Sequence, residues 1–209
     1  MTPPLRGLYA ITDDHLLVDR LLPAVQAALA GGCRWVQYRS KHSKHSNAQQ
    51  RKAEAQQLLT LCRTYNAFLL INDDVALAKT VGADGVHLGQ EDMSLTEARR
   101  VLGKQAIIGI TCHNSLSLAH TAQQEGADYV AFGRFFSSST KQSAPPADLS
   151  ILHTAKQQLA IPVVAIGGIT LDNAKSVLDE GADMLAVVGD LFSAHDVTAR
   201  AQAYTALFD

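Results

Sequence analysis

The sequence predicts an α/β fold, a closed (β/α)8 TIM barrel of eight parallel strands with outer helices. Three features favour it: eight short apolar stretches, a helical pattern between successive stretches, and a recurring Gly-Ala-Asp turn. Regular alternation of strand and helix indicates a parallel sheet, and eight such units can close into a barrel. The chain of 209 residues is short for this fold, so we expect a single domain covering residues 1–209.

Each predicted strand is an apolar run that leads into polar residues or glycine. In order, the strands cover residues 8–12, 35–39, 68–72, 85–89, 107–111, 129–133, 163–167 and 184–189. Because the active site of a TIM barrel lies at the carboxyl ends of its strands, the polar residues at these positions are candidate site residues.

Helices are predicted between the strands and after the last one. They cover residues 19–30, 47–65, 74–81, 95–102, 116–125, 148–159, 172–180 and 197–208. Ser94 and Glu97 form a capping-box pattern at the start of the fourth helix. Gly-Ala-Asp at 82–84, 126–128 and 181–183 follows three of the helices, where glycine can adopt the left-handed conformation that ends a helix. We expect these turns to be structural.

Composition excludes several classes of function. With 18 basic and 20 acidic residues the net charge is −2, which gives no sign of nucleic-acid binding. Three cysteines form no C-x-x-C pair, so neither a disulfide framework nor a zinc site is expected, and a reducing cytoplasm is the simplest location. Residues 1–7 lack the apolar core of a signal peptide, and no apolar run approaches membrane-spanning length.

The second strand carries polar residues at alternate positions. Gln37, Arg39 and Lys41 would point to one side of an extended chain. Since an unpaired amide or guanidinium is costly inside a barrel, a ligand or a carboxylate partner is expected.

Acidic residues follow the third and fourth strands. Asn72 and Asp73 end one strand, and Asp92 lies shortly after the next, so neighbouring strands would bring the two carboxylates to one rim. Such a pair suits Mg²⁺, which completes its octahedral shell with water and phosphate oxygens. The structural alternative is that Asp73 caps a helix while Asp92 pairs with a lysine.

Glycines follow the last two strands, where TIM barrels commonly bind phosphate. Gly167, Gly168 and Gly189 would allow an anion to approach the backbone, although tight turns alone would also explain them. Residues 137–141 offer four hydroxyls and an ammonium for an anion, or form a solvated turn. The polar loops 40–50 and 137–146 are interpreted either as ligand clamps or as disordered connectors.

Other reactive residue types are interpreted as bystanders. His87 lies inside a strand and His113 just beyond one, while four further histidines in polar segments are expected to face solvent: His15, His42, His45 and His195. Cys112 has no His-Asp partner at a readable spacing, so it is not expected to be a nucleophile.

Taken in order, six motifs resemble the thiamine-phosphate synthase family over nearly the whole chain. They lie at residues 8–13, 37–41, 71–74, 85–92, 138–141 and 165–169. The resemblance implies a transferase that joins hydroxymethylpyrimidine diphosphate to thiazole phosphate, releases diphosphate and yields thiamine phosphate. It implies Mg²⁺ as cofactor and small molecules as partners, and a homo-oligomer is compatible with it.

The resemblance also implies roles for individual residues. Gln37, Arg39, Lys41 and Asn72 would bind the pyrimidine diphosphate, and Asp73 with Asp92 would bind magnesium. Ser138, Thr140 and Lys141 would form the loop at the thiazole phosphate and diphosphate. Arg39, Lys41 and Lys141 would be catalytic, and the remaining substrate-binding residues would be Thr111, Gly168, Val188 and Gly189.

Four positions depart from the commonest family pattern: Asp74, Thr111, Ser138 and Gly189. Asp74 alone changes sign, because an arginine is usual there, and we expect altered local pairing at this position. Two alternatives to the synthase are a thiazole tautomerase-like barrel, which would lack part of the cationic and magnesium set, and a non-catalytic sensor of thiazole phosphate.

Overall fold

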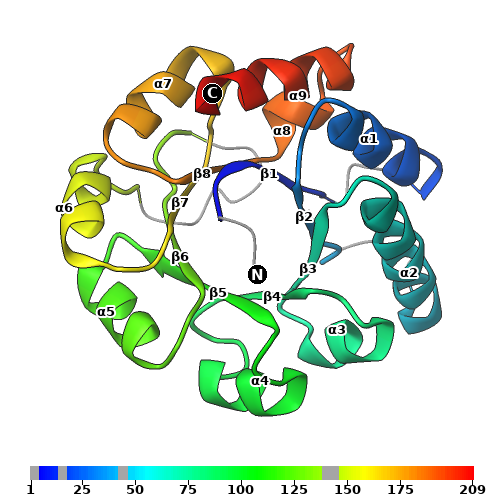
Figure 1. Cartoon of the computed structure of the whole chain (residues 1–209), viewed down its shortest axis with the longest axis horizontal. Coiled ribbons are helices and arrows are strands. Elements are labelled where there is room, and N and C mark those ends of the chain that lie inside the picture. Colours follow the sequence, from blue (N-terminus) through cyan, green and yellow to red (C-terminus); the bar gives the residue numbers. More distant parts are fainter. Residues whose placement is uncertain (1–4, 14–17, 42–46, 138–145) are drawn as a thin grey trace.

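The computed structural model describes residues 5–13, 18–41, 47–137 and 146–209. Eight parallel strands, paired in chain order, form a closed barrel, and β8 returns to pair with β1. The predicted fold class is therefore confirmed (Figure 1). The strands are β1 (Gly7–Ile11), β2 (Trp35–Tyr38), β3 (Phe68–Asn72), β4 (Gly85–Leu88), β5 (Ile107–His113), β6 (Tyr129–Phe132), β7 (Val163–Ile166) and β8 (Met184–Val187).

Helices surround the barrel on the outside (Figure 1). They are α1 (Val18–Ala30), α2 (Ala48–Thr64), α3 (Val75–Val81), α4 (Leu95–Leu102), α5 (Leu116–Gln124), α6 (Ser150–Gln158), α7 (Leu171–Asp179), α8 (Gly189–Phe192), α9 (Val197–Thr205) and the 3-10 turn η1 (Ala206–Phe208). Ser94 caps α4 as predicted, because its hydroxyl accepts from the Glu97 backbone and donates to the Glu97 carboxylate. The reciprocal backbone bond of a complete capping box is present instead at α7, between Thr170 and Asn173.

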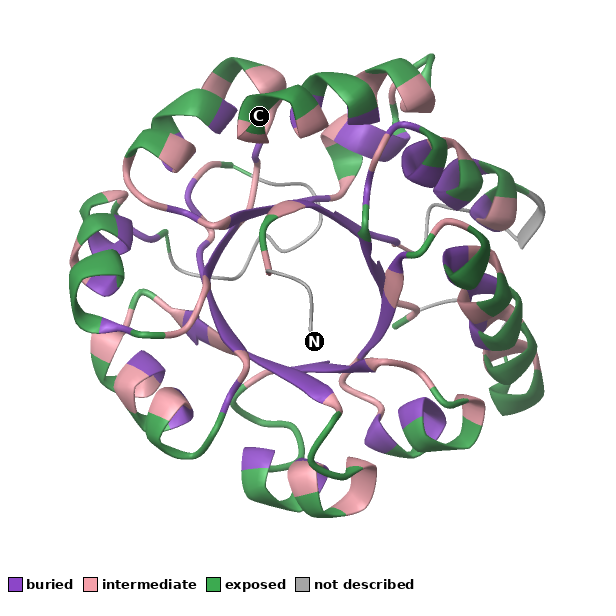
Figure 2. Ribbon diagram, viewed as in Figure 1, coloured by how far each residue is buried: buried purple, intermediate pink, exposed green. Residues whose placement is uncertain are grey.

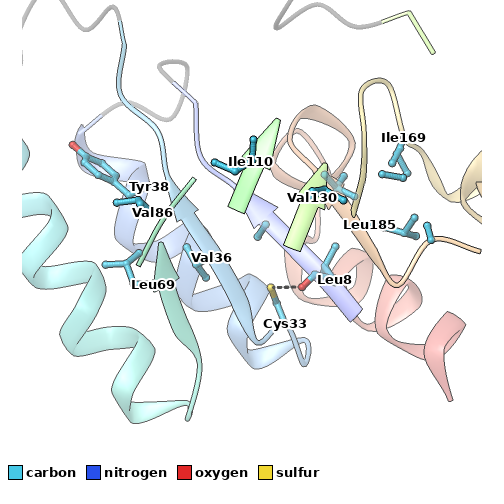
Figure 3. Packing of buried hydrophobic residues seen from close by; sticks show 14 of the residues in the cluster. Leu8, Cys33, Val36, Tyr38, Leu69, Val86, Ile110, Val130, Ile169 and Leu185 are labelled. Carbon is cyan, nitrogen blue, oxygen red and sulfur yellow. Dashed lines mark hydrogen bonds between the residues drawn. The ribbon is translucent and has the colours of Figure 1, made fainter. Parts of the chain in front are cut away.

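Strands of this barrel are apolar on both faces because each face is covered. Val36 and Leu69 belong to the core between the sheet and the helices (Figure 3), whereas Tyr9, Trp35 and Tyr129 belong to a second core inside the barrel. Figure 2 shows the result. The strands form a buried ring, and the helices around it are buried mainly on the side that faces the strands. Fully buried parallel strands therefore appear as continuous apolar runs in the sequence.

The Gly-Ala-Asp turns are structural, as expected. Gly82, Gly126 and Gly181 have φ angles of 73°, 90° and 104°, in the left-handed region that L side chains rarely adopt. The aspartate of each turn accepts a hydrogen bond from the first part of the preceding strand, as Asp128 does from the Ile108 backbone at 2.7 Å.

Three local predictions differ from the structure. The eighth strand ends at Val187, and the four residues Gly189–Phe192 form α8, which was not predicted. Tertiary contacts hold this short helix, because Asp190 accepts from Arg200 at 2.9 Å and from the Tyr204 hydroxyl at 2.7 Å. The second strand ends at Tyr38, and the fifth continues through a register shift to His113.

In the part of the chain that the structure describes, no helix is long and apolar enough to cross a membrane.

Candidate active site

A pocket of about 530 Å³ lies at the carboxyl ends of β2 and β3 and the start of α3. Its walls include Lys41, Asn72 and Asp73, all named from the sequence, together with Arg51 from α2. Segments more than 30 residues apart in the chain meet here because parallel neighbouring strands end on the same rim.

The central group of this rim consists of one ammonium and two carboxylates. Lys41 Nζ lies 2.7 Å from Asp73 Oδ2. The carboxyl groups of Asp73 and Asp92 are within hydrogen-bonding reach of each other, and Asp92 Oδ2 also accepts from the Gly89 backbone at 2.7 Å. The predicted convergence of Lys41, Asp73 and Asp92 is therefore present.

The two carboxylates have opposite pKa shifts. Partial burial and the hydrogen-bonded neighbour Asp73 raise the pKa of Asp92. Burial would also raise the pKa of Asp73, but hydrogen bonds from Lys41 and Asp92 and the positive charge of Lys41 bring it below its ordinary value. Asp73 additionally adopts a φ of 62°, a left-handed conformation that is unusual for a residue with a side chain. Backbone outliers of this kind cluster at functional sites.

This acidic pair fits a magnesium ion in its donor chemistry. The neighbouring carboxylate of Asp73 raises the pKa of Asp92, and a cation bound to both groups would relieve their repulsion. Mg²⁺ commonly takes one or two protein carboxylates. No group of three or more His, Cys, Asp or Glu side chains within the described residues could hold a metal ion. Water and phosphate oxygens would therefore complete the coordination.

Asp74 is the residue that caps α3, so the alternative in which Asp73 caps this helix is wrong. Asp74 Oδ1 accepts from the Leu77 backbone at 2.8 Å, and Asp74 Oδ2 pairs with Arg51 at 2.7 Å. The expected change in local pairing at Asp74 is thus an ion pair with α2. No sequence pattern marked Arg51, because it lies in the first turn of a polar helix.

On β2, Gln37 has a different partner from the ones expected. Its side chain is buried, 2% exposed, and Nε2 donates to the Tyr9 hydroxyl at 2.8 Å rather than to a carboxylate. Arg39 is anchored by its backbone N–H to Thr12 Oγ1 at 2.9 Å. Its Nε is buried with no partner among the described residues, as expected of a group that meets an anion.

Polar side chains continue from Gln37 across the barrel interior. Tyr9 and Tyr129 join their hydroxyls at 3.0 Å, Tyr129 OH lies 2.9 Å from His87 Nδ1, and His87 Nε2 lies 2.8 Å from Thr111 Oγ1. His87 is therefore a member of the interior network. In the sequence, His87 alternates with Val86 and Leu88, which pack toward the helices, and this alternation was the available signal that His87 faces inward.

Gly109 on β5 makes room for this network. A Cβ atom at Gly109 would lie 1.9 Å from the Tyr129 ring. Burial raises the pKa of both Tyr9 and Tyr129, so both hydroxyls keep their protons and can donate.

On the opposite side of the same rim, after β7, Gly167 and Gly168 have φ angles of 101° and 65°. A Cβ at Gly168 would meet the Ser137 carbonyl at 2.4 Å, and the Phe136 backbone donates to the Gly167 carbonyl at 3.0 Å. Close packing of the loop after β6 therefore requires these glycines. It also brings the start of the predicted hydroxyl loop next to Gly168.

The remaining predicted residues of this rim are only partly described. Val188 follows β8, and Gly189 begins α8 next to the end of β7. Ser138, Thr140 and Lys141 lie outside the described residues, as do His15, His42 and His45. The suggestion that loops 40–50 and 137–146 act as clamps falls largely outside them as well.

Cys112 is unsuited to nucleophilic chemistry. It is fully buried, its thiol donates to the Ile110 carbonyl, and burial raises its pKa to about 12. His195 is exposed, as expected.

A closed (β/α)8 barrel with charged side chains and tightly packed glycines at its strand ends defines the class of TIM-barrel enzymes. A family model described as thiamine monophosphate synthase matches residues 8–191. The chain belongs to this family, and it is a transferase of thiamine biosynthesis.

Individual relatives agree with the family. A thiamine-phosphate synthase from Marinobacter nauticus is 55% identical over 205 residues, covering 97% of this chain and 90% of that protein. One from Nitrosococcus oceani is 50% identical over 205 residues, covering 98% and 93%. The solved structure of a thiamine phosphate pyrophosphorylase from Pyrococcus furiosus matches with a TM-score of 0.86 at 35% identity, over 97% of this chain and 95% of that one.

Proposed function

We propose that the chain joins hydroxymethylpyrimidine diphosphate to thiazole phosphate by a dissociative reaction, with Mg²⁺ held by Asp73 and Asp92. The observation that carries the proposal is the contact of Lys41 with Asp73 beside Asp92, at the mouth of a barrel from this family. A bound magnesium ion would neutralise charge on the diphosphate.

The chemistry requires stabilisation of a leaving group more than proton transfer. The bond between the pyrimidine methylene carbon and the diphosphate oxygen breaks, and its electrons leave with the diphosphate. The electron-rich aminopyrimidine stabilises the positive methylene, which the thiazole nitrogen then attacks. Preorganised positive charge at the departing oxygen is the main help such a reaction needs.

Two described residues that follow β2 offer that charge. The ammonium of Lys41 is held in place by Asp73, and the buried Nε of Arg39 has no partner within the described chain. Both would donate to diphosphate oxygens, and Lys141 would do so from the loop after β6. Asn72 lines the same pocket and would help to orient the substrate.

The thiazole phosphate would bind on the other side of the same rim. Gly168 and Gly189 follow the neighbouring strands β7 and β8, where this fold commonly binds phosphate through backbone donors. Val188 packs against the core inside the barrel, and Ser138 and Thr140 would add hydroxyl donors. The three unpaired, buried cysteines support a cytoplasmic location.

The deciding experiment supplies both substrates to the purified protein, with and without magnesium, and follows thiamine phosphate and diphosphate by mass spectrometry. We expect both products, and only with the metal present. A thiazole tautomerase would convert its substrate without releasing diphosphate, and a sensor would bind thiazole phosphate without any turnover. Either result would rule out the synthase.

A further inference from the structure

We propose that the ion pair between Arg51 and Asp74 positions the backbone of the metal site. It holds Asp73 in its left-handed conformation, so that the Asp73 carboxylate has its direction before a cation binds. Arg51 and Asp74 are then positioning residues, since neither is a proposed ligand of the metal. The inference rests on the proposed function, because it concerns the magnesium site at that same barrel mouth.

Asp73 lies at the centre of a tight turn between β3 and α3. The Asp74 backbone N–H donates to the Asn72 carbonyl at 2.7 Å, which closes a three-residue turn around Asp73. With a φ of 62° at Asp73, this is the γ-turn type with a positive central φ, which is rare and strained. Such a conformation persists only where the surrounding structure over-determines it. The contacts on either side of Asp73 therefore decide whether its carboxylate keeps this direction.

Different parts of the fold hold the two sides of the Asp73 N–Cα bond, the bond about which φ turns. On the strand side, the Asp73 N–H donates to the His87 carbonyl of β4 at 2.9 Å. On the helix side, Asp74 Oδ1 accepts from the Leu77 backbone at 2.8 Å, but that bond lies within α3 and moves with it. Within the described residues, Arg51 is the one side chain of another element that bonds to Asp74, at 2.7 Å.

Arg51 is placed by α2, which packs outside β2 and β3 (Figure 1). One turn further along this helix, Glu54 accepts from the Tyr38 hydroxyl of β2 at 2.5 Å, and Leu58 is fully buried. Arg51 Nη2 reaches Asp74, while Arg51 Nε is buried without a partner among the described residues. Because a buried donor without a partner is costly, the contact with Asp74 is what favours this pose of the side chain.

The turn directs two consecutive carboxylates to two different cations. Asp73 Oδ2 lies 2.7 Å from Lys41 Nζ, and Asp74 Oδ2 lies 2.7 Å from Arg51 Nη2. These four side chains line the same pocket, and the Asp92 carboxyl group is within hydrogen-bonding reach of Asp73. Holding Asp74 on α2 therefore keeps Asp73 turned toward Lys41 and Asp92, where the cation is proposed to bind.

Magnesium binding separates this role from a simple effect of charge. If charge alone matters, removing a positive group near the site strengthens the binding of Mg²⁺. Loss of a positioning contact weakens binding instead, because Asp73 leaves the conformation that the site requires. Arg51→Met removes the charge and keeps an aliphatic side chain, so the two explanations predict opposite signs for this variant.

The dissociation constant for Mg²⁺ is measured by titrating the ligand-free protein with magnesium chloride and fitting the rise in Tm. Arg51→Met should raise it by at least about fivefold, the order of the cost of a left-handed residue. Asp74→Asn keeps an oxygen that caps α3 and should raise it similarly, whereas Arg51→Lys keeps the ion pair and should stay within about twofold of wild type. Because the pair is partly exposed, the Tm of each metal-free variant should fall by no more than about 4 °C.

A second measurement needs no metal. Backbone NMR chemical shifts of Asp73 in the metal-free protein report the sign of its φ angle. We expect shifts typical of a positive φ in wild type and a change toward ordinary negative values in Arg51→Met. Unchanged Asp73 shifts in Arg51→Met would overturn the inference.

Arg63→Met is the matched control. Arg63 lies at the other end of the same helix and pairs with Asp84 at 2.9 Å, away from the barrel mouth. This variant should bind Mg²⁺ as wild type does. An Arg51→Met protein that binds Mg²⁺ as tightly as wild type, or more tightly, would overturn the inference. A raised KM for the pyrimidine diphosphate with unchanged Mg²⁺ binding would also overturn it, because Arg51 would then contact the substrate directly.

Failure of the proposed function gives different results. Wild type that binds Mg²⁺ but forms no thiamine phosphate would overturn the synthase reaction, while weaker Mg²⁺ binding by Arg51→Met would still support the positioning role. Wild type that neither binds Mg²⁺ nor requires it for turnover would overturn the proposed metal site, and the inference with it.

Discussion

At the barrel mouth, neighbouring charges change the pKa values of two carboxyl groups, those of Asp73 and Asp92. Lys41 keeps Asp73 ionised, and the ionised Asp73 raises the pKa of Asp92. Without a cation the folded protein therefore binds a proton at Asp92 more readily than the unfolded chain does. The contribution of Asp92 to the stability of the metal-free protein is therefore lost as the pH rises through this raised pKa, and a divalent ion would remove the repulsion between the two carboxylates.

Asp92→Asn should separate catalysis from stability. We expect turnover to fall by at least about tenfold, equivalent to about 1.4 kcal/mol, through lost metal binding. The metal-free variant should be no less stable than wild type at neutral pH, since the repulsion with Asp73 is gone and the amide oxygen can still accept from Gly89. Steady-state rates and thermal unfolding with and without Mg²⁺ measure both effects.

The neighbouring Glu91 supplies the control for this variant. Glu91 is exposed, and Glu91→Gln should keep both wild-type turnover and the magnesium-induced rise in Tm. In wild type that rise should shrink as the pH falls toward the raised pKa of Asp92, because a protonated carboxyl is a poor ligand. An Asp92→Asn protein that keeps the rise in Tm would remove Asp92 from the metal site.

At the scale of the elements, the Gly-Ala-Asp turns attach a helix to two strands. Asp128 Oδ2 accepts from the Ile108 backbone and from Arg99 of α4, both at 2.7 Å. Asp84 and Asp183 repeat the arrangement, each with the backbone N–H of a strand and a basic residue of the helix that comes before that strand in the chain. These turns lie at the amino ends of the strands, where this fold places stability rather than catalysis.

Asp128→Ala should therefore lower stability without changing turnover. It leaves the Ile108 N–H without its acceptor and removes a partner of Arg99, so we expect a loss of about 1–3 kcal/mol in the free energy of unfolding. Urea denaturation measures it. As a control, Asp179→Ala breaks the exposed ion pair with Lys175 and should cost about 0.5 kcal/mol or less. Equal losses in the two variants would contradict a structural role for the turn.

For the molecule as a whole, closure of the barrel seals its thiols between the sheet and the helices. Cys33, Cys62 and Cys112 are each 0% exposed, and burial raises their pKa values to about 11, 12 and 12. Figure 3 shows Cys33 against the Leu8 backbone of the neighbouring strand. Since thiolate is the reactive form, native thiols should be both inaccessible and protonated.

Reaction with a coloured disulfide reagent should report the opening of the barrel. At neutral pH we expect no rapidly reacting thiol in the native protein and three in denaturant, with rates that rise in step with unfolding. Because the folded-state pKa values are raised, these groups favour the folded state fully below the ordinary thiol pKa, and this contribution is lost as the pH rises above it. A thiol that reacts at once in native buffer would show that the barrel opens locally at that cysteine.

Local properties of the sequence determined the eight strand-helix units, the Gly-Ala-Asp turns and the positions of Lys41, Asp73 and Asp92 at strand ends. Periodicity, helix caps and glycine turns act over a few residues, and the parallel order of the strands then brings the ends of β2, β3 and β4 to one rim. The roles of Ser138, Thr140 and Lys141 stay predictions.

Only the tertiary structure decided which polar side chains meet. Three contacts join segments that are distant in sequence. Arg51 pairs with Asp74, Arg200 pairs with Asp190 of α8, and His87 lies within hydrogen-bonding distance of the Tyr129 hydroxyl. Whether a buried amide or imidazole meets a ligand or another side chain depends on register across the closed barrel and on the space left by Gly109. No local sequence pattern predicts these partners, because they lie on strands that are distant in sequence and meet only when the barrel closes.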